Sequence, residues 1–452
     1  MTDELESVGT NEQGSGHVKA VIVNFTGGRE NWGCQATSYN LYRFSKVVLQ
    51  QFGLESLETV AFPPGCLLDI VQRERFGARI RNVLSDPNAS ETDLRWLESL
   101  VVSRFGRWTD RVRGADVVIF QGEGSIGPSR HFVQTRLFGL PYIAARLWKK
   151  PVISLNQTIT LRNSADKSTL KNIYESFSLN AVREQASVDF CSEVGIDDIL
   201  VCPDMAFCDL FDLAEMKSGA PDYFCATGSA AFDTYNLDQY CDTLEEIASI
   251  LRLGLKVLVS RPMDMPLYQQ MSRRLGDRVE LVSSRQVPSF HDMLGIVRNA
   301  AFVIGGRYHT SISALSQLTP VILTPSNSHK SDGIGRLLGI DLPVYPANER
   351  EALIAKAQDL IRGREQAVNE LKSAHSRLSR QFEEFSVSLS DFLVSQGYAR
   401  ISENEPRSIG DAIRNSDVPW NVNKVPRGLS KVFSQISVER NLAAFDWQPS
   451  SQ

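Results

Sequence analysis

The sequence lacks the features that mark disulfide-rich, membrane-spanning and nucleic-acid-binding proteins. Its 452 residues include 7 scattered cysteines, an odd number that excludes a disulfide scaffold and predicts reduced thiols. No apolar run approaches the roughly 18–20 residues that span a bilayer, and the acidic N-terminus has no signal-peptide pattern. Lysine and arginine total 48 against 53 acidic residues, without a basic run, so nucleic acid is not an expected partner. We therefore expect a cytoplasmic protein without a transmembrane segment, in peripheral contact at most with a membrane-linked substrate.

Spacings typical of metal ligands are also missing. The sequence contains no H-x-x-x-H, C-x-x-C or paired-acid pattern at the spacing of metal ligands. Cys202 and Cys208 have no histidine nearby in the sequence. We therefore expect neither a metal site nor a bound cofactor.

Short runs rich in valine and isoleucine are present, and they alternate with stretches in which apolar residues recur every three to four positions. This alternation is typical of strand–helix–strand units, with parallel sheets covered on both faces. It predicts an α/β fold with two doubly wound Rossmann-like lobes. The expected strands are Val18–Asn24, Glu58–Phe62, Asp116–Gln121, Pro151–Gln157, Leu179–Arg183, Ile199–Cys202, Tyr223–Thr227, Lys256–Ser260, Val279–Val282, Phe302–Gly305 and Pro320–Thr324.

The chain also changes character after the predicted sheets. Beyond Ala347 the pattern is helical without strands, and Gly363 is the expected break between a shorter and a longer helix. This region is either a helix that leans across both lobes or an arm that binds a partner. Trp420 and Trp447 are expected to anchor an irregular tail. The predicted organisation is a flexible leader (1–16), an N-terminal lobe (17–213), a C-terminal lobe with an anion site (214–346), a helical extension (347–397) and an irregular tail (398–452).

The loop between the first strand and the first helix, Asn24–Ala36, contains several glycines. Loops at the carboxyl ends of strands build the ligand crevice of an open α/β sheet. Gly27, Gly28 and Gly33 permit close backbone approach, and a helix that begins after Gly33 favours an anion. A flexible connection without a ligand is the alternative. Cys34 is placed like a nucleophile at a helix start, but no base lies beside it in the sequence.

A second glycine-containing segment, Gly122-Glu123-Gly124-Ser125-Ile126-Gly127, follows a predicted strand. Its G-x-G-x-x-G pattern is that of a dinucleotide site. The next strand, however, ends in Asn156-Gln157 rather than in the acidic residue that would hold a ribose. The segment therefore favours a glycine-rich turn that lines a cleft between the lobes, with a purely structural turn as the alternative.

The third segment follows the strand that ends at Gly305. It contains Gly306, Arg307, His309, Thr310 and Ser311. Thr310 or Ser311 is expected to cap the next helix, which would place Arg307 and His309 at its positive end. Lys330 follows the next strand and so emerges at the same sheet edge. A guanidinium, an imidazole and an ammonium group together predict a site for phosphate or carboxylate.

Short blocks in a fixed order from about residue 20 to residue 340 carry a wider resemblance. They are Asn31-Trp32-Gly33-Cys34-Gln35-Ala36, Gly122-Glu123-Gly124-Ser125, Arg183-Glu184-Gln185-Ala186-Ser187, Pro203-Asp204-Met205-Ala206-Phe207, and Arg307, His309, Pro320 and Lys330. As an ordered set these blocks resemble the polysaccharide pyruvyl transferase family. The first loop of that family usually carries an acid after the glycine, where this sequence has Cys34.

The resemblance implies a GT-B-like fold and a transferase that moves the pyruvyl group of phosphoenolpyruvate onto two hydroxyls of one sugar, giving a ketal. The acceptor would be a glycan of an exopolysaccharide or its lipid-linked precursor. Arg307 and Lys330 suit the anionic donor, with Gly306, Thr310 and Ser311 at the helix start. His309 is the expected acid that protonates the methylene carbon.

The acceptor side has several candidates. Glu123 or Asp204 is the expected base or orienting group, although a cap or hinge role suits Asp204 better. Arg183 and Glu184 are either a structural pair or ligand-binding groups. The residues expected to line the acceptor side or the cleft are Asn31, Gly33, Cys34, Gly122, Gly124, Ser125, Arg183 and Asp204.

Two other functions fit the same sequence. One is a glycosyltransferase of the same architecture that uses a sugar nucleotide. The other is a non-catalytic member that binds an anionic glycan or a partner through its helical region and tail.

Overall fold

The structure is a computed structural model that describes residues 17–62, 67–126, 135–159, 164–213, 220–229, 237–326, 330–401 and 408–418. The predicted leader, Trp420 and Trp447 lie outside the described residues. No helix within these ranges is both long and apolar enough to cross a membrane.

The first lobe is built on a parallel sheet in the order β2-β1-β3-β4-β5-β6. Every residue of β4 is buried, as expected for a strand with helices on both faces. The strands are β1 (Val18–Val23), β2 (Leu54–Val60), β3 (Val117–Ile126), β4 (Val152–Ile159), β5 (Leu179–Val182) and β6 (Ile199–Val201). The helices of this lobe are α1 (Trp32–Gln50), α2 (Leu67–Ser85), α3 (Glu91–Phe105), α4 (Trp108–Gly114), α5 (Leu140–Arg146), α6 (Ser164–Glu175) and α7 (Gln185–Glu193), with a π-turn, η1 (Thr135–Gly139), before α5.

The second lobe is built on a parallel sheet in the order β11-β10-β7-β8-β9. Its strands are β7 (Tyr223–Ser229), β8 (Gly254–Val259), β9 (Val279–Ser283), β10 (Val303–Gly306) and β11 (Val321–Leu323). Its helices are α8 (Leu237–Leu251), α9 (Met265–Leu275), α10 (Phe290–Arg298), α11 (Tyr308–Ser316) and α12 (Lys330–Leu338), with the 3-10 turns η4 (Pro262–Asp264) and η5 (Gly276–Arg278). The prediction of two Rossmann-like lobes is confirmed.

A 3-10 segment, η2 (Met205–Asp212), follows β6 and lies between the lobes. It packs against α1 of the first lobe and α11 of the second. All but one of its residues are buried. The segment η2 therefore belongs to the core between the lobes.

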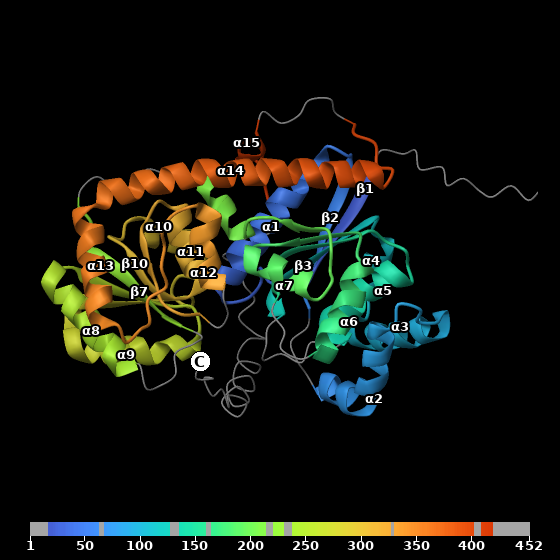
Figure 1. Ribbon diagram of the computed structural model, residues 1–452, viewed down its shortest axis with the longest axis horizontal. Coiled ribbons are helices and arrows are strands. Elements are labelled where there is room, and N and C mark those ends of the chain that lie inside the picture. The colour runs from blue at the N-terminus through green and yellow to red at the C-terminus, as the bar shows by residue number, and fades with distance from the viewer. Residues whose placement is uncertain are drawn as a thin grey trace, which may run out of the picture.

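The C-terminal region is helical, as predicted, and breaks at Gly363 between α13 (Arg350–Arg362) and α14 (Arg364–Ser395). Figure 1 shows α14 running across both lobes, which is the first of the two expected arrangements. Buried residues recur along it at three-to-four spacing, among them Leu378, Phe382 and Leu389. The helix thus joins the lobes through one continuous apolar face.

Part of the tail that was expected to be irregular is helical. A short helix, α15 (Ile409–Arg414), packs on η2 and α1. Its buried anchors are Ile409 and Ile413, because these are the apolar residues one helical turn apart.

We expect Phe382→Ala to destabilise the protein by about 3–5 kcal/mol, the usual range for truncating a buried phenylalanine. Its ring lies 6.1 Å from that of Phe44 in α1 and 5.9 Å from that of Phe211 in η2, between centroids. Urea unfolding measures the change. Val387→Ala on the same helix, where the side chain is 54% exposed, is the matched control and should stay within about 0.5 kcal/mol of the parent. Equal effects of the two variants would contradict the packing role of α14.

Candidate active site

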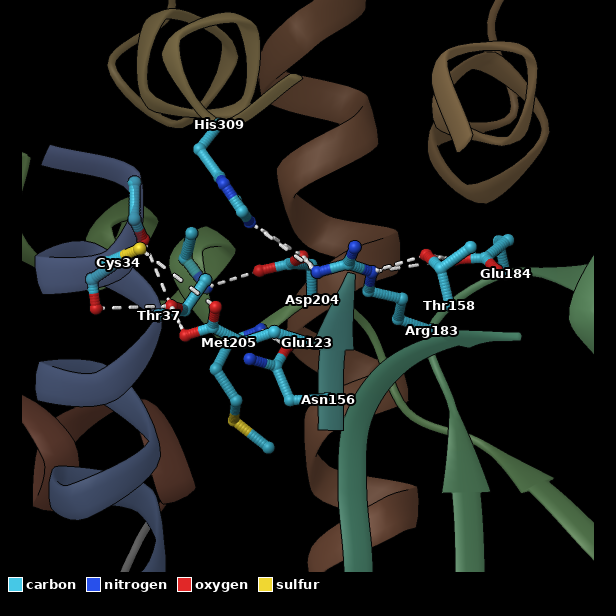
Figure 2. Close-up of polar contacts among 12 residues, drawn as sticks. Cys34, Thr37, Glu123, Asn156, Thr158, Arg183, Glu184, Asp204, Met205 and His309 are labelled. Atoms are coloured by element: carbon cyan, nitrogen blue, oxygen red, sulfur yellow. Dashed lines mark hydrogen bonds and ion pairs between the residues drawn. The ribbon is translucent and has the colours of Figure 1, made fainter. Parts of the chain in front are cut away.

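His309 reaches from the second lobe to the first. The helix α11 begins at Tyr308, so His309 lies in its first turn. Its ring packs on Gly33 of α1, where an added Cβ would lie 2.5 Å from Nδ1 of the imidazole. Its Nε2 lies 3.5 Å from Oδ2 of Asp204 and 3.4 Å from Nη1 of Arg183, and Figure 2 shows the ring pointing at both residues. Only a glycine at position 33 leaves room for this ring.

Arg183 and Asp204 form a buried ion pair beneath His309. Nη1 of Arg183 donates to Oδ2 of Asp204 at 2.6 Å, and both side chains are fully buried. Oδ1 of Asp204 accepts from the backbone N–H of Ala206 at the start of η2. Burial alone would raise the pKa of Asp204, but Arg183 and His309 outweigh it and lower this pKa to about 2. Asp204 is therefore a cap and an ion-pair partner, and its side chain is fully buried.

The second terminal nitrogen of Arg183 and the ammonium of Lys330 converge on Gly124. A Cβ added there would lie 3.7 Å from Nη2 of Arg183 and 3.9 Å from Nζ of Lys330. Among the described residues, Nη2 has no hydrogen-bond partner. The ring of Tyr308 lies against both cations, 4.8 Å from Cζ of Arg183 and 5.4 Å from Nζ of Lys330. Basic groups of both lobes, Arg183 and Lys330, therefore gather at one place.

Arg307 has a partner that the sequence did not indicate. Its Nη2 and Nε donate to Oδ1 of Asp264 in η4, at 2.5 and 2.9 Å. Asp264 is buried, whereas the Arg307 side chain is 11% exposed. Gly306 packs tightly against Pro325 and Ser229, and an added Cβ would collide with both residues.

The expected capping role of Thr310 and Ser311 is wrong. Because α11 begins at Tyr308, both residues lie inside the helix, and Arg307 occupies the N-cap position. Both are buried. The Ser311 hydroxyl donates back to the carbonyl of Arg307 at 3.4 Å.

The glycine segment after β3 is also different from the expected turn. β3 continues through Ile126, so Gly122, Gly124 and Ser125 are strand residues, and Gly127 lies outside the described residues. Gly122 is held against the side chain of Gln157 in β4, with no room for a Cβ. The backbone of Glu123 is left-handed, with φ of 49°, an uncommon and strained conformation for this residue type.

The carboxylate of Glu123 is buried and is held by hydroxyl and amide donors. Oε1 accepts from Thr26, from Thr37 at 3.2 Å and from Gln121 at 2.5 Å. Oε2 faces the thiol of Cys34, with Sγ at 4.0 Å. Threonine and glutamine on three separate segments gave no sequence signal, so these partners were missed.

Cys34 lies in the first turn of α1, above Glu123. Asn31 caps this helix, with its Oδ1 accepting from the N–H of Cys34 at 3.2 Å, so α1 starts earlier than predicted. Burial, and second the charge of Glu123, raise the pKa of the Cys34 thiol to about 11. The thiol is therefore protonated near neutral pH and unsuited to act as a nucleophile.

We expect Cys34 to react with iodoacetamide at pH 7.5 at least about tenfold more slowly than a free thiol, because little thiolate is present below its raised pKa. Glu123→Gln removes one of the two causes, so it should lower this pKa and speed the reaction. Peptide mass spectrometry at residue 34 measures the rate, and the unfolded protein is the control. A folded-state rate equal to that of the unfolded chain would contradict the environment described for this thiol.

No group of three or more histidine, cysteine or carboxylate side chains that would suit a metal ion occurs within the described ranges. The site is instead rich in fixed cationic and hydroxyl groups, a donor set suited to an anionic substrate.

Solved structures with low sequence identity share the two-lobed fold. A protein assigned as a UDP-N-acetylglucosamine 2-epimerase from Listeria monocytogenes is 13% identical, with a TM-score of 0.51, covering 83% of this chain and 97% of its own. S. aureus MnaA, solved with UDP, is 13% identical, with a TM-score of 0.50 and coverages of 86% and 99%. At this identity the likeness shows the fold alone, which is GT-B-like.

No curated protein matches the chain by sequence. A family model described as polysaccharide pyruvyl transferase matches residues 60–328, more than half of the 452 residues. The match covers three of the five blocks that carried the resemblance completely, and the last block up to Pro320. The first block, Asn31-Trp32-Gly33-Cys34-Gln35-Ala36, and Lys330 lie outside it. The matched range includes Glu123, Arg183, Asp204, Arg307 and His309. The chain therefore belongs to the polysaccharide pyruvyl transferase family and is a transferase.

Proposed function

We propose that the protein transfers the pyruvyl group of phosphoenolpyruvate onto two hydroxyls of one sugar, in a polysaccharide or its precursor, and forms a ketal. The observation that carries this proposal is the convergence of His309 and Lys330 from one lobe with Arg183 from the other. Phosphoenolpyruvate carries both a phosphate and a carboxylate, and several cations at fixed positions are what such a donor needs.

Donor binding would rest on Arg307 and Lys330. Asp264 orients the guanidinium of Arg307 and partly balances its charge, while leaving the group at the surface of the site. The ring of Tyr308 steadies Lys330. Since α11 begins at Tyr308, its free N–H groups add positive potential beside both side chains.

The reaction would proceed by addition and then displacement. One sugar hydroxyl gives its proton to a base and forms a C–O bond to C2 of phosphoenolpyruvate, while the electron pair of the C=C bond takes a proton at the methylene carbon, which becomes a methyl group. A neighbouring hydroxyl then forms the second C–O bond at C2, while the bond from C2 to the phosphate oxygen breaks. Phosphate leaves with the bonding pair, and the last hydroxyl proton passes to a base or to the phosphate. His309 would supply the proton for the methylene carbon.

Glu123 is the carboxylate that suits the acceptor side. Its Oε1 accepts from three donors, whereas Oε2 faces the Cys34 thiol. The strained backbone at Glu123 is consistent with a functional position. Cys34 stands where the family usually has an acid, so Glu123 is proposed to take the base or orienting role here.

Phosphate release tests the proposal. The protein is incubated with phosphoenolpyruvate and hexose or uronic-acid glycans, and we expect phosphate to appear only when an acceptor is present. No release with any of these acceptors, together with a melting temperature raised by sugar nucleotides and not by phosphoenolpyruvate, would instead support a glycosyltransferase.

Arg307→Ala and His309→Ala should divide binding from chemistry. Losing a charge-assisted contact costs about 1.5–3 kcal/mol, so Arg307→Ala should raise the KM for phosphoenolpyruvate by roughly tenfold or more. His309→Ala should lower kcat by about 10²–10⁴-fold, with a smaller change in KM. Steady-state kinetics measures both. Asp264→Asn keeps the charge of Arg307 but removes the carboxylate that orients it, so it should raise this KM less than Arg307→Ala does. Equal losses of kcat and KM in the two main variants would contradict this division.

Gly33→Ala tests the seat of the imidazole ring. Alanine suits a helix, but its Cβ would meet Nδ1 of His309 and push the ring away, so we expect kcat to fall more than about tenfold in a folded protein. Gly28→Ala in the same loop, where an added Cβ meets nothing within 4 Å, should leave kcat unchanged. Normal turnover in Gly33→Ala would rule out the proposed importance of the ring position.

A further inference from the structure

Asp204 joins the two lobes through its side chain. It sits between β6 and η2, and its carboxylate is fully buried. Its Oδ1 is taken by the start of η2, and its Oδ2 by Arg183 and, at 3.5 Å, by His309. Of these partners only His309 comes from the second lobe and is partly exposed, at 20% of its side chain.

We propose that Asp204 is a positioning residue for His309, fixing the Nε2 side of an imidazole that the other lobe supplies. The proposal rests on the proposed role of His309 as the acid. Gly33 bounds the ring along its Cβ–Nδ1 edge, and Asp204 holds the opposite edge. The ring is therefore fixed from two elements of the first lobe, although its backbone belongs to the second.

Arg183 gives Asp204 the fixed charge and geometry that this role needs. Its Nη1 donates to the same Oδ2 that faces His309, and its Nε donates to Thr158 at 2.9 Å. The guanidinium cannot turn without breaking both bonds. The carboxylate is thus held at two sides, by Arg183 and by the N–H of Ala206, before the histidine meets it.

The matched control is Glu184, the second buried carboxylate beside Arg183. Its Oε2 lies 3.6 Å from Nε of Arg183, and it accepts hydrogen bonds from Thr158 and Ser187. Where the structure describes the chain, no hydrogen bond joins it to His309. Asp204→Asn and Glu184→Gln each remove one negative charge next to the same guanidinium. A role limited to balancing Arg183 predicts the same outcome for both variants.

We expect Asp204→Asn to lower kcat by about 10- to 100-fold, with the KM for phosphoenolpyruvate changed less than about threefold, because a displaced catalytic group costs turnover rather than donor binding. Glu184→Gln should keep both constants near those of the parent. If Asp204→Asn fails to fold, Arg183→Gln/Asp204→Asn is compared with Arg183→Gln, and the added asparagine should still lower kcat. Equal kcat in the compared proteins would overturn the proposal.

An NMR experiment detects the contact between Asp204 and His309 without requiring turnover. The full chain has 6 histidines, and His309 is assigned in a ¹⁵N-histidine spectrum by its loss in His309→Gln. We expect the ¹⁵N chemical shifts of the His309 ring nitrogens to change in Asp204→Asn and to stay the same in Glu184→Gln. An unchanged His309 signal in Asp204→Asn would overturn the proposal. Absence of any phosphate release by the parent protein would instead overturn the proposed function, while the spectra would still decide the role of Asp204.

Discussion

The contact of His309 with Gly33, Asp204 and Arg183 is the interaction on which the rest of the site depends. Each of the three partners belongs to the first lobe, and the histidine belongs to the second. The site therefore exists only while the lobes keep this arrangement. A buried ion pair is expensive to desolvate and adds little stability by itself, so its value here is that it gives the ring a fixed neighbour.

Other contacts between the lobes keep the first turn of α1 in place beneath the ring. The indole N–H of Trp32 donates to the carbonyl of Val287 at 2.7 Å. The side chain of Gln35 donates to the carbonyl of Pro288 and accepts from the N–H of Phe290, both at 3.0 Å. These bonds tie α1 to the start of α10 on either side of Gly33 along the chain. Further from the site, α14 crosses both lobes and packs on α1 (Figure 1). The helix α1 thus contacts both the ring of His309 and the long helix α14.

The sheets could be predicted because the pattern that defines them is local. Consecutive buried valine and isoleucine residues mark strands covered on both faces, and every strand of the structure overlaps an expected one. The break at Gly363 was predictable for the same reason. The start of α11 was not, because no hydroxyl residue caps it and Arg307 takes that position. A helix that starts without a side-chain cap leaves no local mark, so Thr310 and Ser311 were misplaced.

The chemistry of the site was only partly predictable. Strand order brings Arg307, His309 and Lys330 to one edge, which follows from the carboxyl ends of adjacent parallel strands. The partners that orient these groups come from other elements: Asp264 lies in η4 of the same lobe, and Gly33 lies in the other lobe, so that only packing of the lobes brings it to His309. The burial of Asp204 likewise depends on the assembled lobes.

A crystal structure of the protein with phosphoenolpyruvate bound tests the central claim most directly. The account predicts the phosphate and carboxylate oxygens within hydrogen-bond distance of Arg307 and Lys330, with the methylene carbon directed at the ring of His309. A donor bound away from these residues, with its methylene carbon out of reach of His309, would contradict it.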